Sequence, residues 1–498
     1  MSPGPPRGEY RAKGRAVALV GAFAPATAAL TAQWILHTAT RRAPFAPYSV
    51  GQWIIRHTPG GLATTAIDHL GRGALRLLAV ITIGGALALG MVLRRVRPAL
   101  LAAISFASTI AAAVLDPSDP PIRWAVAGGA VAAVAAALMA TALARPARSP
   151  GVDYGRRRLI AGLAAGIGTA ALGGVALWRI LRSVMPGRVE ATRPITIHTD
   201  PGFDHIAGLS PLVTSRQDHY VVDIDLVDPV VAAEGWRLRI DGGVERPLAM
   251  SLDDLVAMPT VERLVCMSCI SNPVGGPLVS DSTWTGVPLR DVLARARPSG
   301  AGTTLLARGA DGYFETVPVD EGTLTLAVVA VAMDGEFLPR EHGYPARLLI
   351  PGRYGYKSVK WLQSLSAVAG SQQGYWVQRG WDSAGVIRTE SRFDVPGDHS
   401  QVPSRFTAAG VAWAGGRSIS RVEVSADDGR TWTPAGLEPV VDPLAWRRWR
   451  LVMTLRPGVY ALTVRAIDGT GVVQSASNLP PHPSGASGYH RIVVTVFE

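Results

Sequence analysis

Five long apolar runs dominate roughly the first 180 positions of the chain. They are rich in Ala, Leu, Val and Gly and keep charged residues out of their interiors. About 20 apolar residues in helix cross a hydrocarbon layer about 30 Å thick. Buried helices of a soluble domain are the alternative, but five runs in succession favour membrane spans. The predicted spans are Ala16–Ile35, Ala74–Leu93, Leu100–Leu115, Trp124–Ala144 and Leu159–Trp178.

Basic residues near these runs predict an orientation, because short cytoplasmic loops are enriched in Lys and Arg. They gather before the first run, after the second, and between the fourth and fifth. This places the N-terminus in the cytoplasm and everything after Trp178 outside, with lipid as a partner. Arg156 to Arg158 fit two interpretations equally, a twin-arginine export signal and an ordinary cytoplasmic flank.

The histidines of this region do not favour a haem. A transmembrane b-type haem is held by histidines that lie inside helices. His37, His57 and His69 fall at the end of a predicted span or in the loop after it. We therefore expect no haem in the chain.

Beyond about residue 190 the pattern changes to short strand-like runs divided by turn residues, as where Asp241 and two glycines follow Trp236–Ile240. After about residue 396 the runs alternate more strictly and are separated by Asp-Gly turns, which is typical of a β-sandwich. The predicted fold is therefore multi-domain. It comprises an all-α membrane domain of five helices (1–182), an α+β domain (190–396) and an immunoglobulin-like β-sandwich (397–498).

Charge and cysteine content narrow the classes of function. The net charge is +11, but the arginines cluster at the ends of apolar runs, so we expect no nucleic-acid partner. Two cysteines are too few for a disulfide framework in a chain of this length. Cys266 and Cys269 could be a Cys-x-x-Cys redox pair, half of a zinc site, or the source of a single metal-binding thiolate.

Three ordered blocks carry the most specific signal in the chain. The first runs from Thr214 to Asp223, the second from Val265 to Gly276 with both cysteines and Asn272, and the third from His342 to Leu362. Together these blocks resemble the molybdopterin-binding domain of the sulfite oxidase family. The resemblance implies a molybdenum–molybdopterin cofactor, whose metal a soft cysteine thiolate ligates.

The resemblance also implies roles for individual residues. Cys269 would be the metal ligand and the catalytic residue, and Asn272 and His342 would orient the pterin. The pterin phosphate calls for cations and hydroxyl or backbone donors. The residues expected to hold the phosphate are Arg347, Lys357, Ser358 and Lys360. A further set of cofactor-binding residues belongs to the entry segment that closes over the cofactor: Thr214, Asp218, His219 and Tyr220. His219 departs from the family, which usually has Phe at this position.

A second departure concerns the substrate. Many sulfite oxidases have two arginines after the Asn, where this chain has Pro273 and Val274, and those arginines attract an anion. Arg353, Arg379 and Arg388 are candidates to replace that charge.

The predicted function is an extracytoplasmic two-electron oxygen-atom transfer on a small sulfur-containing substrate. A reductase of oxidised sulfur such as methionine sulfoxide, and a cofactor-free membrane scaffold, are the alternatives. The expected partners are a quinone or an extracytoplasmic cytochrome as electron partner, and a second copy of the chain, because the resembled family dimerises through its C-terminal module.

Overall fold

Two compact units make up the chain in a computed structural model. The model describes residues 26–37, 45–70, 72–92, 98–115, 126–136, 187–225, 228–299, 304–370 and 372–498. The first unit comprises Met1–Thr58, Leu70–Met185 and Ile224–Asp228, and the second comprises Pro59–His69, Pro186–Asp223 and Pro229–Glu498. Each unit is described separately below.

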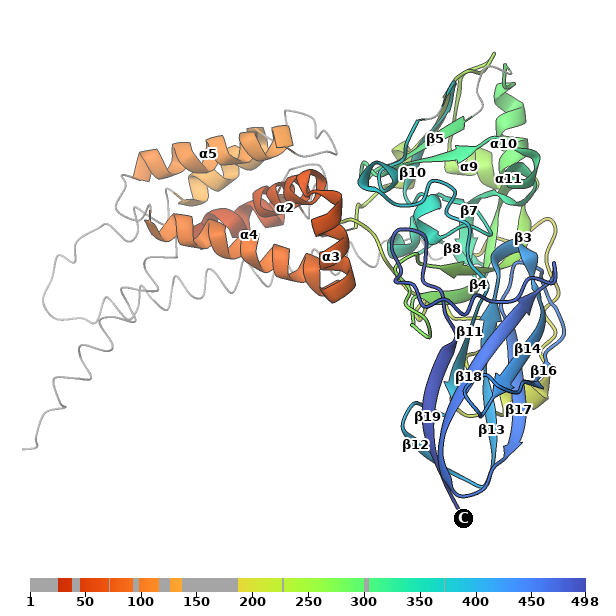
Figure 1. Ribbon diagram of the computed structural model, residues 1–498. Helices are drawn as coiled ribbons and strands as arrows, with labels where there is room; N and C mark the ends of the chain where they lie inside the picture. The colour runs from red at the N-terminus through yellow and green to blue at the C-terminus, as the bar shows by residue number, and fades with distance from the viewer. Residues whose placement is uncertain are drawn as a thin grey trace, which may run out of the picture. The chain divides into compact units, whose positions relative to one another are not determined.

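The first unit is helical in its described residues. Its helices are α2 (Ala46–His57), α4 (Arg72–Val92), α5 (Pro98–Leu115) and two further helical segments, 26–37 and 126–136. Helix α2 packs on both α4 and α5, as the red and orange ribbons of Figure 1 show. The Gln33 amide donates to the Thr109 hydroxyl at 2.5 Å, so polar as well as apolar contacts join these helices.

The described helices do not bear out the predicted membrane domain. None of them is both long enough and apolar enough to cross a bilayer. In α4, Arg72 and Arg76 occupy the first turns, and the uncharged remainder is only about 24 Å long at 1.5 Å per residue. Helix α5 has 18 residues, about 27 Å, which is also short of the hydrocarbon thickness. The predictions of five spans and of a multi-pass membrane location are therefore wrong.

Two helices also form where the sequence pattern indicated only a loop. Helix α2 and helix α3 (Gly60–Leu70), which belongs to the second unit, lie between the first and second predicted spans. The run Leu159–Trp178 and Arg156 to Arg158 lie outside the described residues. The first and fourth predicted spans fall only partly within them.

The first domain of the second unit contains one mixed sheet, one antiparallel sheet and several short helices. The first sheet has the order β2-β1-β10-β5-β6, and β1 and β10 are parallel. Its strands are β1 (Leu238–Gly242), β2 (Leu248–Met250), β5 (Thr304–Gly309), β6 (Phe314–Pro318) and β10 (Leu362–Val368). The helices are α8 (Pro201–Asp204), α9 (Leu252–Val256), α10 (Leu289–Ala296) and α11 (Glu321–Leu326).

The second sheet of this domain carries the cysteines. Its order is β3-β4-β7-β8, with β9 paired to β7. The strands are β3 (Val261–Ser268), β4 (Val279–Pro288), β7 (Val328–Met333), β8 (Glu336–Phe337) and β9 (Arg347–Leu349). Strands β4 and β7 are buried almost throughout, because other elements cover both faces. The β3–β4 hairpin holds Cys266 opposite Asp281 and leaves Cys269 just beyond the end of β3.

The C-terminal domain is a β-sandwich, drawn in blue in Figure 1. One sheet has the order β11-β13-β17-β16 and the other β12-β19-β18-β14-β15. Their inner faces share one apolar core, centred on Trp449, Val422, Val464 and Val494. The strands are β11 (Glu390–Val395), β12 (Ser400–Pro403), β13 (Arg405–Trp413), β14 (Ile419–Ser425), β15 (Thr433–Pro434), β16 (Gly436–Leu437), β17 (Arg447–Thr454), β18 (Gly458–Asp468) and β19 (His490–Phe497). Both later domains are thus β-rich.

Candidate active site

The loop after β3 is a closed turn that begins at Cys269. The Cys269 N–H donates to the Leu278 carbonyl at 2.9 Å, and the Asn272 N–H donates to the Cys269 carbonyl at 3.1 Å. The Asn272 side-chain oxygen accepts from the Leu278 N–H at 2.8 Å. Gly276 lies so close that a Cβ there would be 2.6 Å from this oxygen. We call residues 269–278 the cysteine loop.

The two cysteines lie in different surroundings. Both thiols are free and buried. Burial raises the pKa of Cys266 well above its usual value, and the neighbouring Asp281 raises it further. Burial also raises the pKa of Cys269, but the Ser271 N–H and hydroxyl donate to its sulfur and act in the opposite direction. Cys269 is therefore the thiol whose neighbours offer hydrogen-bond donors that oppose the effect of burial.

The zinc alternative gains no support from this arrangement. Cys266 lies within β3, where its N–H donates to the Leu444 carbonyl at 3.0 Å. Across the described residues, no three or more His, Cys, Asp or Glu side chains are grouped so that they could hold a metal ion. The cysteine pair thus lacks the further ligands that a tetrahedral zinc site requires.

Arg347 is buried beside a cluster of aromatic rings. Its guanidinium lies 5.3 Å from the centre of the Trp284 ring, and its Nε has no hydrogen-bond partner among the described residues. Burial lowers the pKa of Arg347 to about 10. A buried cation without an ion pair is costly, so this position is suited to an anionic group from outside the chain.

Two histidines complete the aromatic cluster. The His219 and His342 rings meet edge to face at 5.1 Å, and His219 contacts Trp284 in the same way at 5.6 Å. His342 Nε2 lies 3.0 Å from the Arg216 carbonyl, and His219 Nδ1 lies 3.0 Å from the Ser282 hydroxyl. Burial lowers the pKa of His219 well below its usual value, and the positive groups around it lower it further. The structure thus brings His219, His342 and Arg347 together.

The entry segment runs along β4 and is only partly buried. The Thr214 hydroxyl accepts from the Asp281 N–H at 3.2 Å, and the Tyr220 N–H donates to the Ser280 hydroxyl at 3.1 Å. The Tyr220 hydroxyl approaches Gly355 so closely that a Cβ there would be 2.7 Å away. Asp218 instead accepts from the Ser215 hydroxyl at an exposed turn, so Asp218 does not join the cluster.

The predicted phosphate-binding residues after Arg347 all have partners within the chain. Lys360 Nζ donates to Asp223 at 2.8 Å and to the Glu341 carbonyl at 2.9 Å. The Ser358 hydroxyl accepts from the Ile350 N–H at 3.1 Å.

Lys357 has a different position from the other predicted phosphate ligands. Its Nζ forms a buried ion pair with Glu315 at 2.9 Å. Burial raises the pKa of Glu315, and Lys357 opposes that shift. Lys357 thus compensates an internal carboxylate.

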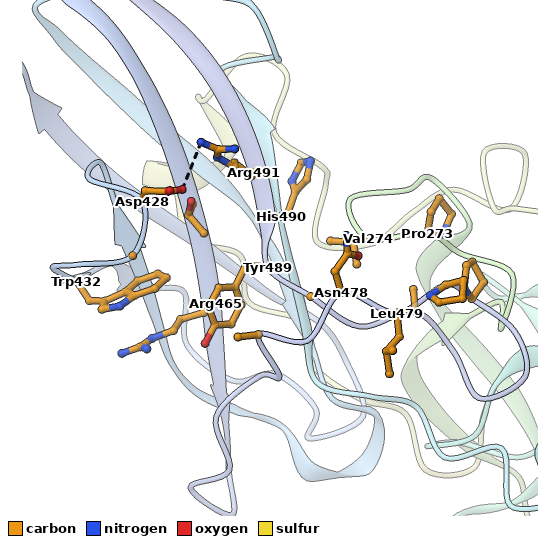
Figure 2. A pocket seen from close by; sticks show the side chains of 17 residues that line it. Pro273, Val274, Asp428, Trp432, Arg465, Asn478, Leu479, Tyr489, His490 and Arg491 are labelled. Atoms are coloured by element: carbon orange, nitrogen blue, oxygen red, sulfur yellow. Dashed lines mark ion pairs between the residues drawn. The ribbon is translucent and has the colours of Figure 1, made fainter.

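A cavity of about 770 Å³ begins at the cysteine loop and extends along the C-terminal domain. Pro273 and Val274 line it together with residues 478–481, and Figure 2 shows Trp432 and Arg465 farther along it. Arg465 stacks on Trp432 at 4.0 Å and forms an ion pair with Glu423 at 2.7 Å. The part of the wall that belongs to the cysteine loop is uncharged.

Two family models match adjacent parts of the chain. The oxidoreductase molybdopterin-binding domain matches residues 225–376, and the Mo-co oxidoreductase dimerisation domain matches residues 385–496. Together they cover more than half of the chain. The chain belongs to the sulfite oxidase-type molybdopterin oxidoreductases. Members of this family use a molybdenum–molybdopterin cofactor, and so does this oxidoreductase.

Individual relatives agree with the family models. The chain is 30% identical to sulfite oxidase of Gallus gallus over 51% of its length and 66% of that protein. It is also 30% identical to the mitochondrial sulfite oxidase of Homo sapiens, over 59% of its length and 62% of that protein. The chain therefore spans about two thirds of the length of these relatives.

A solved structure shares the fold. The sulfane dehydrogenase SoxCD from Paracoccus pantotrophus superposes with a TM-score of 0.50 over 64% of this chain and 92% of that one, at 23% identity.

The site has unsatisfied groups that fit the cofactor of this family. Arg347 Nε and Asn272 Nδ2 are buried without hydrogen-bond partners in the described part of the chain. Buried donors of this kind are rare in folded proteins. An anionic, acceptor-rich pterin phosphate would satisfy both the charge and the hydrogen-bonding capacity that the fold leaves open.

Sequence reasoning missed His482 and Trp381 beside the cysteine loop. His482 Nε2 lies 3.0 Å from the Ser271 hydroxyl, and its ring stacks on Trp381 at 4.8 Å. His482 lies in a loop of the C-terminal domain, 211 positions from Ser271. No spacing rule links residues so distant in the sequence, so only the fold could have revealed this contact.

Proposed function

We propose that this oxidoreductase transfers an oxygen atom to or from a small sulfur compound, with the Cys269 thiolate as the protein ligand of molybdenum. The observation that carries the proposal is the position of Cys269 in a closed loop, where Ser271 donates to its sulfur. A thiolate is the soft, electron-donating ligand that such a metal requires. The bound cofactor supplies the two-electron chemistry, and the chain supplies binding, orientation and exclusion of water.

The remaining site residues fall into three groups. Arg347 supplies the cation for the pterin phosphate, with Lys360 and Ser358 nearby in sequence but already held by internal partners. Asn272, His342, His219 and Tyr220 orient the ring system, and Thr214 holds the entry segment on β4. Asp218 closes an exposed turn, and Lys357 acts indirectly by stabilising the adjoining fold.

A reductive reaction on a neutral sulfoxide is the second candidate, and the uncharged wall at Pro273 and Val274 favours it. The three arginines that could replace the missing charge are engaged in holding nearby backbone. Arg353 donates to the Ala384 carbonyl at 2.5 Å, Arg388 to the Ser484 carbonyl at 3.0 Å, and Arg379 to the Tyr375 carbonyl at 2.9 Å. Each contact fixes the direction of a guanidinium N–H, and none of the three arginines is among the residues that line the cavity beside Pro273 and Val274.

The partners follow from the same reasoning. The matched dimerisation domain supports a homodimer. Two cysteines are too few to hold an iron–sulfur cluster, and the electrons of the reaction pass to or from a separate carrier, either a quinone or a cytochrome.

Metal analysis tests the proposal. Wild-type protein should contain molybdenum and pterin in equal amounts. Cys269→Ser should lose turnover, whereas Cys266→Ser, the matched control three positions away, should keep most of it. Equal loss in the two variants would instead support a Cys-x-x-Cys redox pair. Turnover of sulfite compared with that of a neutral sulfoxide then separates the two candidate reactions.

A further inference from the structure

His482 of the C-terminal domain contacts the cysteine loop of the other domain. Its Nε2 lies 3.0 Å from the Ser271 hydroxyl. The Ser271 hydroxyl and N–H both donate to the Cys269 sulfur. A serine hydroxyl has one proton, and the sulfur takes it. When Nε2 carries the ring proton, His482 donates it to the Ser271 oxygen, and imidazole, hydroxyl and sulfur then form a continuous hydrogen-bonded path.

The imidazole is held in a fixed orientation. Trp381 stacks on it at 4.8 Å with the planes 29° apart, and Trp376 stacks against Trp381 at 4.1 Å and 9°. Stacked rings of this kind restrict rotation and allow little tilt. The Nε2–H direction toward Ser271 is therefore set by packing.

The loop that carries His482, residues 479–487, is anchored by contacts that directly follow the histidine. The Asp382 N–H donates to the Pro483 carbonyl at 2.9 Å, and Arg388 donates to the Ser484 carbonyl at 3.0 Å. Gly485 has φ +88° and lies against Tyr354, where an added Cβ would be 1.9 Å from the hydroxyl oxygen. We call residues 479–487 the histidine loop.

We propose that His482 is a positioning residue that acts through Ser271 to set the electron-donating strength of the Cys269 sulfur toward the metal. This inference rests on the proposed role of Cys269. Hydrogen bonds to a metal-bound thiolate withdraw electron density from sulfur, which stabilises the reduced metal. Outer groups that hydrogen-bond to ligands tune a metal in this way. The C-terminal domain would then serve the metal centre as well as dimerisation.

The test compares three variants of the full-length holoenzyme by redox titration of the Mo(V) electron paramagnetic resonance signal. His482→Phe keeps an aromatic ring for Trp381 but removes the donor, and Ser271→Ala removes the hydroxyl. Both should lower the Mo(VI)/Mo(V) potential, so that the Mo(VI) to Mo(V) ratio at fixed potential rises about tenfold, or 59 mV for a one-electron couple. His482→Gln keeps an N–H donor at this position, so its potential should lie close to that of the wild type.

Molybdenum content and the X-ray absorption spectrum are measured on the same samples. A wild-type potential in fully loaded His482→Phe would overturn the inference and leave the Cys269 assignment intact. Equal potential shifts in His482→Phe and His482→Gln would also overturn it, because packing alone would then explain the effect. A wild-type spectrum without protein sulfur on molybdenum would instead overturn the proposed function itself.

Discussion

Arg347 is a residue at which stability and the proposed phosphate binding would oppose each other. It is 5% exposed, lies over Trp284 and has a buried Nε for which the described residues provide no hydrogen-bond partner. Lys357 presents the opposite case, since its buried charge is neutralised by Glu315. Both residues looked alike in the sequence, as cations in one predicted phosphate-binding segment. The different surroundings of the two charges lead us to propose different roles for the two residues.

Replacing Arg347 should separate cofactor binding from folding. Arg347→Met removes a buried, unpaired cation, so the cofactor-free protein should gain about 1–3 kcal/mol in its free energy of unfolding. The same variant should lose most of its molybdenum and pterin. Denaturant titration of cofactor-free protein and metal analysis of purified holoprotein measure the two effects. A destabilised cofactor-free variant would contradict the assignment of Arg347 to the phosphate.

The Lys357–Glu315 pair predicts a different outcome. Lys357→Met leaves Glu315 buried and unpaired and should cost about 3–5 kcal/mol of stability. The double variant Lys357→Met, Glu315→Leu should recover most of that loss and bind molybdenum like the wild type. If the stable double variant lacked cofactor, Lys357 would be a direct ligand of the phosphate.

Glu390 makes the stability depend on pH. Burial raises its pKa to about 8, although Arg388 and Arg392 oppose the shift. The folded protein then binds more protons than the unfolded chain between about pH 4.5 and pH 8. The contribution of Glu390 to stability is complete below this range and is lost as pH rises through it, by up to about 1.4 kcal/mol per pH unit. Glu390→Gln should flatten this dependence in chemical denaturation measured from pH 5 to pH 8.

Local elements near the site are easier to predict from the sequence than contacts between residues that are far apart in the chain. Val261–Ser268 forms β3, and the turn from Cys269 to Asn272 follows it directly. The apolar N-terminal runs led to the wrong prediction of membrane spans because residue type alone does not fix the length of a helix. In α4, Arg72 and Arg76 occupy the first turns and shorten the uncharged part of the helix. No motif or pattern in the sequence indicated that the histidine loop contacts the cysteine loop.

We expect substitutions at two glycines of positive φ, one inside the histidine loop and one outside it, to differ in their effect on stability and on the Mo(V) signal. Gly485→Ala would place a Cβ 1.9 Å from the Tyr354 hydroxyl oxygen, whereas Gly471, at φ +86°, has no neighbour within 4 Å of an added Cβ. Gly471→Ala should cost only the backbone strain, about 1 kcal/mol. Gly485→Ala should cost more and should also shift the Mo(V) signal as His482→Phe does. Equal effects on the signal would argue against a link between this loop and the metal.

At the scale of the whole molecule, the two later domains form one compact unit. The family match to a dimerisation domain leads us to expect a homodimer, with twice the 52.4 kDa mass of the chain. Sedimentation equilibrium of the holoenzyme measures this mass. A monomer at micromolar concentration would show that the sandwich serves other contacts in this chain.

The position of His482 in the chain has a consequence for assembly during synthesis. Cys269 leaves the ribosome more than 200 residues before His482 does, and the histidine loop directly precedes β19, which pairs with β18 in the sandwich. The contact that His482 makes with the cysteine loop is therefore absent until the histidine loop has been made. A nascent chain that stalls before the histidine loop would leave the cysteine loop open on that side, and the contact between Ser271 and His482 arises only after synthesis has passed residue 482.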